Sequence, residues 1–472
     1  MDTARIRPTM LNRARCTERA PGVSFIGGPR SNTWSSRYLF QLPRAFTRSS
    51  ALFSDGNPVR RHSFFLRHLD GSPIPCATDG EQGTLNDSKR IAIVVGTRPE
   101  AVKLAPVVQE LNRQSWAEPV LVATGQHGEV VRETLSCFGL RAQVELTAPP
   151  GAVSVSELTA GLLSRLGERL RAPAADAVVV QGDTASALAG AMAGFYSSVP
   201  VVHVEAGLRS GDLRNPFPEE ANRRMIAEVS DLHLAPTRAA HRNLVAEGVA
   251  AERILVTGNT VIDAVVAASR RPPAAGDPLP HRIANSAPLV LVTAHRRENW
   301  GAPIRRVGRA VASLSHQYPE ITFVVAAHMN PSVRTAIEES LHGRPNVQLP
   351  GPIPYDAFAR LLARSVLVIT DSGGIQEEAA AFGIPVLVTR DNTERTEGID
   401  SGLARLVGTQ EPEIVAAAEK EFVREGALSG TANGPYPRRN PYGDGEAARR
   451  CAAACGWLLG RSPRPSDIPG ER

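Results

Sequence analysis

Acidic residues stand where two apolar runs of the chain end. The run 177–180 leads into Gln181-Gly182-Asp183, and the run Val201 to Val204 leads into Glu205. The sequence between them is rich in alanine with helical spacing, which predicts a strand, a helix and a second parallel strand. Ligands of parallel sheets bind beyond the carboxyl ends of the strands, so we expect Asp183 and Glu205 to face one cleft. Glu219 follows and could supply a third carboxylate for general acid–base chemistry.

Each of these acids also has a simpler interpretation. A single carboxylate at a strand end can be a salt bridge or a helix cap, and Glu219 after Pro218 could simply begin a helix. The simpler interpretation is weaker for the three acids together, because two of them end strands of the same predicted sheet.

A Gly-rich turn in the second half is the predicted anion site. Ser372-Gly373-Gly374 follows the apolar run 367–370 and opens a helix, so free backbone N–H groups and the helix dipole could hold a phosphate. Glu378 lies about one helical turn further and could accept hydrogen bonds from two ribose hydroxyls. With Arg98 and His295 at other strand ends, we interpret this as a clamp for the diphosphate of a sugar nucleotide.

The turn Gly96-Thr97-Arg98-Pro99-Glu100 is ambiguous. It links a predicted strand, 91–95, to a helix that Pro99 is suited to begin, and Lys103 lies in the same helix. The helix N-terminus, Arg98 and Lys103 could bind an anion, or the segment could be an ordinary turn with solvated charges.

The alternation of apolar runs and helical segments predicts an α/β fold. Further strands are expected at 120–124, 232–235, 254–256, 289–293, 323–326 and 386–388. This pattern favours two doubly wound, Rossmann-like domains facing each other across a cleft, at 89–258 and 259–440. Residues 271–288 read as a Pro-rich loop, and 441–472 as a terminal helix, expected to pack back on the N-terminal domain, with a tail.

Residues 1–88 differ from the rest in composition. Residues 1–90 contain 14 of the 53 basic residues and 7 of the 48 acidic ones, which leaves 39 basic and 41 acidic residues in 91–472. The basic excess therefore belongs to the extension and is weak support for nucleic-acid binding. We expect 1–88 to be a disordered extension, although a transit peptide or an over-long translation start has the same composition.

Several classes of protein are disfavoured by what the sequence lacks. It has no GxxxxGK[ST] motif and no GxGxxG after the first strand, so neither an ATPase nor a dinucleotide-dependent oxidoreductase is indicated. The five cysteines form neither a zinc motif nor a disulfide framework, so we expect no metal. No apolar run is long enough to span a bilayer.

The motifs together resemble the non-hydrolysing UDP-N-acetylglucosamine 2-epimerases over about residues 89–460. The resemblance is carried, in order, by GTRPEAVKLAP, GDT, HVEAGLRSGD, PFPEEANRR, TAHRREN, TDSGGIQEEA and NPYGDG. It implies a glycosyltransferase-B-like fold and interconversion of UDP-GlcNAc and UDP-ManNAc for cell-envelope polysaccharides. It also implies a cytoplasmic homodimer that needs no dissociable cofactor and binds neither nucleic acid nor membrane.

The resemblance also implies roles for individual residues. Asp183, Glu205, Glu219 and His295 match the family's catalytic positions. The substrate-binding positions are matched by Arg98, Lys103, Arg223, Ser372, Gly373, Gly374 and Glu378.

Three other functions remain open from the sequence: a hydrolysing epimerase that releases ManNAc and UDP, a retaining glycosyltransferase, and a non-enzymatic sugar-nucleotide sensor. The Pro99-Glu100 pair favours the non-hydrolysing class over the hydrolysing one, and the three acids disfavour a transferase or a sensor.

Overall fold

The protein is described from a computed structural model. The described residues are 88–148, 154–171, 174–273, 288–294, 296, 299–327, 331–423 and 440–469. The predicted extension 1–88, apart from Ser88, and most of the predicted Pro-rich loop 271–288 lie outside them.

Within the described residues, the first half of the chain forms a parallel sheet with the strand order β3-β2-β1-β4-β5-β6-β7. Its strands are β1 (Lys89–Val95), β2 (Ala117–Ala123), β3 (Val144–Glu145), β4 (Ala177–Gln181), β5 (Val201–Val204), β6 (Leu232–Ala235) and β7 (Ile254–Val256). The helices between them are α1 (Arg98–Leu111), α2 (Gly128–Ser136), α3 (Val155–Arg171), α4 (Ala185–Tyr196), α5 (Glu219–Val229), α6 (Arg238–Ala246) and the short 3-10 helix η1 (Ala251–Arg253).

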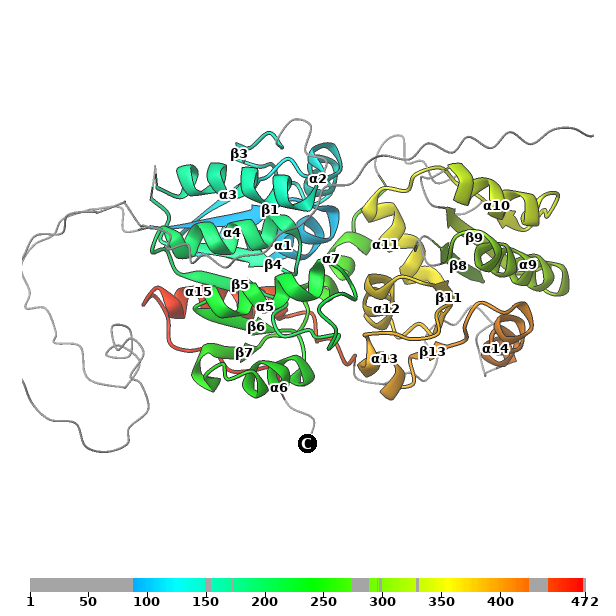
Figure 1. Ribbon diagram of the computed structural model, residues 1–472. Helices are drawn as coiled ribbons and strands as arrows, with labels where there is room; N and C mark the ends of the chain where they lie inside the picture. The colour runs from blue at the N-terminus through cyan, green and yellow to red at the C-terminus, as the bar shows by residue number, and fades with distance from the viewer. Residues whose placement is uncertain are drawn as a thin grey trace, which may run out of the picture. The chain divides into compact units, whose positions relative to one another are not determined.

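The described part of the second half forms another parallel sheet, in the order β10-β9-β8-β11-β12-β13. Its strands are β8 (Leu289–Ala294), β9 (Thr322–Ala327), β10 (Val347–Gln348), β11 (Ser365–Thr370), β12 (Val386–Val388) and β13 (Ala404–Leu406). The helices are α7 (Thr260–Ser269), α9 (Ala302–Gln317), α10 (Pro331–Leu341), α11 (Tyr355–Arg364), α12 (Gly373–Ala380), α13 (Thr396–Asp400), α14 (Glu411–Val423) and α15 (Ala447–Leu458). Figure 1 shows both sheets with their helices.

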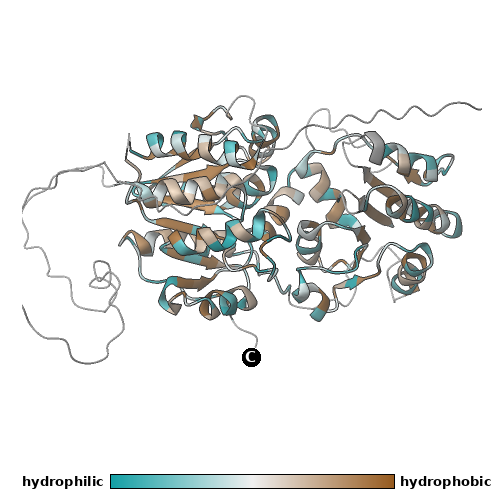
Figure 2. Cartoon of the chain, in the orientation of Figure 1, coloured by the Kyte–Doolittle hydropathy of each residue, from teal (hydrophilic) through white to brown (hydrophobic). Residues whose placement is uncertain are grey.

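Both sheets are covered by helices on both faces, which explains why their strands are continuous apolar runs. In the first sheet, alternate strand residues pack against α1, α2 and α15 on one face and against α3, α4 and α5 on the other. In the second sheet, α7, α11 and α12 cover one face, and α9, α10 and α14 cover the other. Figure 2 shows the hydrophobic strands between helices with hydrophilic outer faces.

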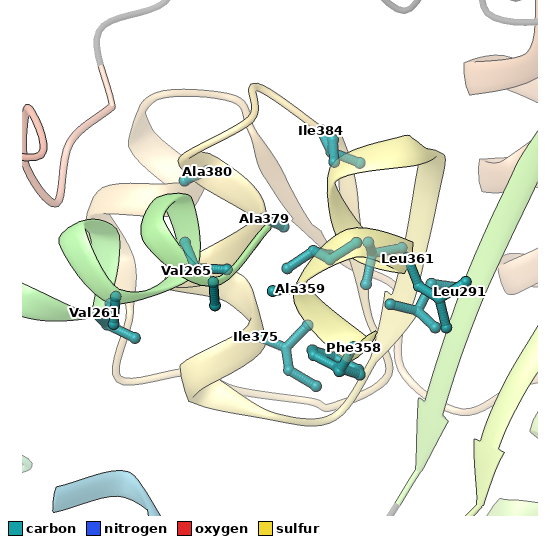
Figure 3. Packing of buried hydrophobic residues seen from close by; sticks show 14 of the residues in the cluster. Val261, Val265, Leu291, Phe358, Ala359, Leu361, Ile375, Ala379, Ala380 and Ile384 are labelled. Carbon is teal, nitrogen blue, oxygen red and sulfur yellow. The ribbon is translucent and has the colours of Figure 1, made fainter. Parts of the chain in front are cut away.

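Two helices cross between the halves of the chain. Helix α7 directly follows β7 of the first sheet, but it packs in the core of the second (Figure 3). The apolar residues that share this core are Val261 and Val265 of α7, Phe358 and Leu361 of α11, and Ile375 and Ala379 of α12. In return, α15 packs against the first sheet through Ala448, Cys451 and Cys455. The chain thus crosses from the first sheet to the second at α7 and returns to the first at α15.

The segment after α15 runs along β7, at the edge of the first sheet. The Ile468 amide donates to the Val256 carbonyl at 2.7 Å, and the Asp467 carboxylate accepts from the Val256 amide at 2.8 Å. The Arg464 guanidinium donates to the Ile254 carbonyl at 2.9 Å. This segment thus satisfies backbone groups that an edge strand would otherwise leave open.

The predicted fold class is confirmed, because two doubly wound parallel sheets are present. The strand order of each sheet reverses at its centre, between β1 and β4 and between β8 and β11, where such folds bind ligands. The short edge strands β3, β10 and β13 were not predicted. The domain limits at 258 and 440 stay predictions. No helix in the described part of the chain is long and apolar enough to cross a membrane.

Two histidines lie next to each other in the interior of the first sheet. His203 of β5 pairs in register with His233 of β6, and both are buried. A ring nitrogen of His203 contacts the Gly182 carbonyl at 2.8 Å, whereas neither ring nitrogen of His233 has a hydrogen-bond partner among the described residues. Burial lowers the pKa of His203 to about 4 and that of His233 to about 3. Both imidazoles are therefore neutral in the folded protein near pH 7.

We expect the buried His233 to make folding sensitive to acid. The unfolded chain binds a proton at this residue below pH 6.5, whereas the folded chain does not, so stability falls as the pH drops. Relative to His233→Leu, the wild type should lose about 1.4 kcal/mol of unfolding free energy per pH unit below pH 6.5 and little above it, which amounts to about 2 kcal/mol between pH 7 and pH 5. Denaturant titrations at several pH values measure this difference. The exposed His316 provides the control: His316→Gln should follow the wild-type slope. Parallel slopes for His233→Leu and wild type would contradict the prediction.

Candidate functional site

A cavity of about 930 Å³ is lined by residues that follow strands of both sheets. The three predicted acids, Asp183, Glu205 and Glu219, all line it. So do six of the predicted substrate-binding residues: Arg98, Lys103, Arg223, Ser372, Gly374 and Glu378. Gly373 begins α12 between two of them. His295 lies outside the described residues. The expectation that Asp183 and Glu205 face one cleft is therefore met by the geometry.

Glu205 is held in place by an unusual backbone conformation and by several donors. Its φ of 64° lies in the left-handed region, which non-glycine residues rarely adopt and which costs about 1 kcal/mol or more. The Lys103 ammonium lies 2.6 and 2.7 Å from the two carboxylate oxygens, and the Gln181 amide donates to one of them. Burial alone would raise the pKa of Glu205, but the nearby charges of Lys103 and Arg395 lower it below its ordinary value. Glu205 is therefore ionised in the folded protein.

Lys103 is enclosed rather than free to meet an anion. Besides Glu205, its ammonium lies 3.7 Å from Glu377 of α12, and Glu377 accepts a hydrogen bond at 2.6 Å from the Arg395 guanidinium. All four side chains are at least 88% buried. Lys103 therefore neutralises carboxylates beside the cavity. Its place near the start of α1 had suggested a direct contact with phosphate instead.

Asp183 and Arg223 form a second pair. One Asp183 carboxylate oxygen lies 2.6 Å from the Arg223 guanidinium, which also reaches Glu220 at 3.0 Å. The Asn222 amide donates to the Asp183 carbonyl at 2.7 Å and so ties the turn after β4 to α5. Arg223 thus orients Asp183 from the side of α5.

Glu219 differs from the other two acids. It is the first residue of α5, as the simpler interpretation of Pro218-Glu219 suggested, and it also lines the cavity. Its oxygen Oε2 is buried and has no hydrogen-bond partner among the described residues. A buried, unpaired carboxylate oxygen is costly, so a bound ligand that donates to it would be favoured.

The two helix N-termini at the cavity are not equivalent. In α1, Glu100 accepts hydrogen bonds from the Gly96 and Thr97 amides at 3.0 and 2.7 Å and so completes a capping box. The chain's own carboxylate therefore caps the helix end where an anion was considered. Arg98 remains exposed beside it, with its guanidinium 5.9 Å from the centre of the Tyr355 ring.

The N-terminus of α12 is open at Gly374, whereas the Glu394 carboxylate and the Arg395 guanidinium lie close to Gly373. Ser372 is its N-cap residue, but the serine side chain makes no capping hydrogen bond. A Cβ atom added to Gly374 would meet no atom within 4 Å, so the backbone there faces open space in the cavity. Free amides and the helix dipole make this a suitable site for an anion such as a phosphate.

Glu378 lies one turn further along α12. Its carboxyl accepts a hydrogen bond from the Tyr355 hydroxyl at 3.0 Å, and burial raises its pKa to about 7. The Tyr355 ring is in turn contacted by Arg98. Glu378 and Arg98 thus meet at one aromatic ring next to the open helix end.

Sequence reasoning missed several residues of this site. They are Gln181, Asn259, Tyr355, Glu377 and Arg395. Gln181 and Asn259 stand at or just after strand ends, so their position was a usable signal. Tyr355, Glu377 and Arg395 come from helices and a loop, and nothing in their spacing indicated the cavity. Among the described residues, no group of three or more His, Cys, Asp or Glu side chains is placed to hold a metal ion.

Comparison with known proteins decides the family. A family model described as UDP-N-acetylglucosamine 2-epimerase matches residues 109–455. The chain belongs to the UDP-N-acetylglucosamine 2-epimerase family. It is 39% identical over 373 residues to a probable UDP-N-acetylglucosamine 2-epimerase of Ralstonia nicotianae, covering 78% of this chain and 98% of that protein.

Solved structures of related epimerases have the same fold. The chain is similar to a UDP-GlcNAc 2-epimerase of Neisseria meningitidis bound to UDP-GlcNAc, with 38% identity, a TM-score of 0.67, and coverage of 76% of this chain and 97% of the other. A glycosyltransferase of kitacinnamycin has the same fold at 13% identity and a TM-score of 0.54, covering 79% and 99% of the two chains. The epimerase fold of this chain is thus glycosyltransferase-B-like, as predicted.

We expect Lys103 to be essential for stability, because its removal leaves two carboxylates buried without their shared cation. Lys103→Met should lower the unfolding free energy by about 3–5 kcal/mol, the range found when one partner of a buried ion pair is removed. Chemical denaturation at neutral pH measures the loss. Lys420→Met changes an exposed lysine on α14 and should alter stability by less than about 0.5 kcal/mol. A Lys103→Met protein as stable as the control would show that the buried charges are not balanced by this residue.

Proposed function

We propose that the chain catalyses the reversible epimerisation of UDP-GlcNAc to UDP-ManNAc at carbon 2, without net hydrolysis. The observation that carries the proposal is one cavity that combines the carboxylates Asp183, Glu205 and Glu219 with the open N-terminus of α12. A sugar nucleotide needs both parts, because its diphosphate is anionic and its sugar must gain and lose protons.

The chemistry explains why both parts are required. The proton on carbon 2 is poorly acidic, so it becomes removable only when UDP leaves carbon 1 and positive charge builds up on the ring. Loss of that proton gives a glycal, and readdition of UDP with a proton delivered to the opposite face gives the epimer. Donors must stabilise the leaving diphosphate, and carboxylates must stabilise the cationic ring and transfer protons.

We assign the nucleotide to the side of α12. The amides of Gly373 and Gly374 would hold the diphosphate, assisted by Arg98 and, as the family resemblance implies, by His295. Glu378 would accept hydrogen bonds from the ribose hydroxyls. Ser372 supports this placement because its hydroxyl is not used to cap the helix.

We assign different tasks to the three acids. Glu205 is ionised, and Lys103 offsets only part of its negative charge. The remaining charge suits it to stabilise positive charge on the sugar ring. Inversion requires proton transfer on two opposite faces of carbon 2. Asp183, oriented by Arg223, and Glu219, with its unpaired oxygen, are the two acids that Lys103 does not hold. We therefore propose that these two move the protons.

We also propose that the enzyme is a homodimer in the cytoplasm, as the resemblance implies. Sedimentation of the purified protein tests the first statement, and cell fractionation tests the second.

The products distinguish this function from its alternatives. Incubation with UDP-GlcNAc, followed by NMR, should show UDP-ManNAc at equilibrium with the substrate. Free ManNAc with UDP would indicate the hydrolysing type instead, and no reaction without a sugar acceptor would favour a transferase.

Asp183→Asn, Glu205→Gln and Glu219→Gln should each lower turnover by about 100-fold or more, the effect expected for lost acid–base or electrostatic groups. Initial rates of UDP-ManNAc formation measure the change. The melting temperature of each variant should be recorded alongside, so that unfolding is not mistaken for lost catalysis. Near-normal rates in all three variants would remove the carboxylates from the mechanism.

Gly374→Val should impair binding of the nucleotide and leave the fold intact. The new side chain would project into open space where the diphosphate is expected, and the KM for UDP-GlcNAc should rise at least about tenfold, or about 1.4 kcal/mol. Gly167→Val is the matched control: this glycine also lies within a helix and has no atom closer than 4.0 Å to an added Cβ, but it does not line the cavity. An unchanged KM in Gly374→Val would place the diphosphate elsewhere.

A further inference from the structure

A row of four alternating charges connects the two sheets beside the cavity. Arg395 contacts Glu377 at 2.6 Å, Glu377 lies 3.7 Å from Lys103, and Lys103 lies 2.6 Å from Glu205. Glu377 lies on α12 and Arg395 directly precedes α13, which are helices of the second half. Lys103 lies on α1, and Glu205 directly follows β5 of the first sheet. The charges balance, which allows all four to be buried.

Asn259 ties the two carboxylates together. Its amide nitrogen lies 3.4 Å from an oxygen of Glu205 and 3.2 Å from an oxygen of Glu377. Asn259 is also the N-cap of α7, where its side-chain oxygen accepts from the Val261 amide at 3.0 Å. The side chain is thereby fixed, so Glu205 and Glu377 are held at a set separation on either side of Lys103.

Lys103 is shared unequally between the two carboxylates. It contacts both oxygens of Glu205 but approaches only one oxygen of Glu377, whose other oxygen is bound by Arg395. Without the charge of Glu377, the Lys103 ammonium would pair with Glu205 alone, and Arg395 would add a second positive charge nearby. The carboxylate would then be more completely neutralised and would stabilise a cationic sugar ring less.

We infer that Glu377 is a positioning residue for the reaction: through Lys103, it determines how much of the negative charge of Glu205 remains available to the substrate. The inference rests on the proposed role of Glu205. It assigns a function to a residue that does not line the cavity and acts only through its neighbour.

The adjacent residue on α12 has a different environment, which makes a matched comparison possible. Glu378 lines the cavity and is bound by Tyr355, whereas Glu377 is bound by Arg395. The other charged or titratable groups that act on Glu377 are Lys103, Glu205, Glu378 and the Tyr442 hydroxyl. Two neighbouring glutamates of one helix would thus serve different parts of the site: Glu378 the nucleotide, and Glu377 the carboxylate of Glu205.

The test compares Glu377→Gln with Glu378→Gln, and the rate is measured as loss of UDP-GlcNAc, whatever the product. Glu377→Gln should lower kcat by about tenfold or more and change KM by less than about threefold. Burial raises the pKa of Glu377, whereas the charges of Lys103 and Arg395 lower the pKa of Glu205, so Glu377 loses its charge first as the pH falls. The ratio of the wild-type kcat to that of Glu377→Gln should therefore shrink as the pH is lowered, because the protonated Glu377 resembles glutamine. Glu378→Gln should instead act mainly on KM.

A double variant separates positioning from simple support of the fold. In a Glu205→Gln background, Glu377→Gln should reduce the remaining rate by less than about twofold, because the residue that it acts through is gone. Glu377→Asp keeps the charge, so its kcat should exceed that of Glu377→Gln near neutral pH and approach it as the pH falls. Should Glu377→Gln fail to fold, Glu377→Asp in the two backgrounds carries the test: any loss of kcat that it causes in the wild-type background should disappear in the Glu205→Gln background.

Two results would overturn the inference: an unchanged kcat in Glu377→Gln at neutral pH, or the same fold loss in both backgrounds. A ratio of wild-type to Glu377→Gln kcat that does not shrink as the pH falls would do the same. The identity of the product, by contrast, tests only the proposed function. A wild-type protein that released ManNAc and UDP would refute the non-hydrolysing assignment and leave the Glu377 comparison intact.

Discussion

The contact between Lys103 and Glu205 is the interaction on which the site depends. A buried carboxylate is unstable without a nearby cation, and a buried ammonium is unstable without an anion. Here each group neutralises the other. Glu377 and Arg395, from the second half of the chain, add a further ion pair beside them. The left-handed backbone at Glu205 is tolerated because several donors hold the side chain in that position.

The two crossings of the chain between the sheets give a rigid frame to the row of charges formed by Arg395, Glu377, Lys103 and Glu205. Helix α7 leaves the first sheet to pack in the core of the second, and α15 makes the return crossing. Asn259 at the start of α7 therefore stands at the crossing itself, where it reaches both Glu205 and Glu377. Helix α12 takes part in the same apolar core and presents its open end to the cavity. The apolar core and the buried charges thus hold the same two elements, α7 and α12, in position.

Much of the fold could be predicted from the sequence because buried parallel strands are short apolar runs, as at β4 and β5. The strand ends then located Asp183 and Glu205. Edge strands such as β3 and β10 have two residues each and no pattern to detect. The partners of the acids were harder to predict: Lys103 suggested a phosphate contact, and only the three-dimensional structure shows it between two carboxylates. The N-terminus of α1 likewise looked like a possible anion site, yet Glu100 caps it.

The segment that follows α15 also limits how this protein can associate. Backbone groups of β7 are hydrogen-bonded by Arg464, Asp467 and Ile468. A neighbouring molecule therefore cannot add a strand at this edge of the first sheet without displacing them. Continuous sheets shared between copies are therefore disfavoured on this side. A dimer that used this side of the first sheet would have to be built by side chains on the outer helical layers, whose composition can change without disturbing the hydrogen bonds of the sheet.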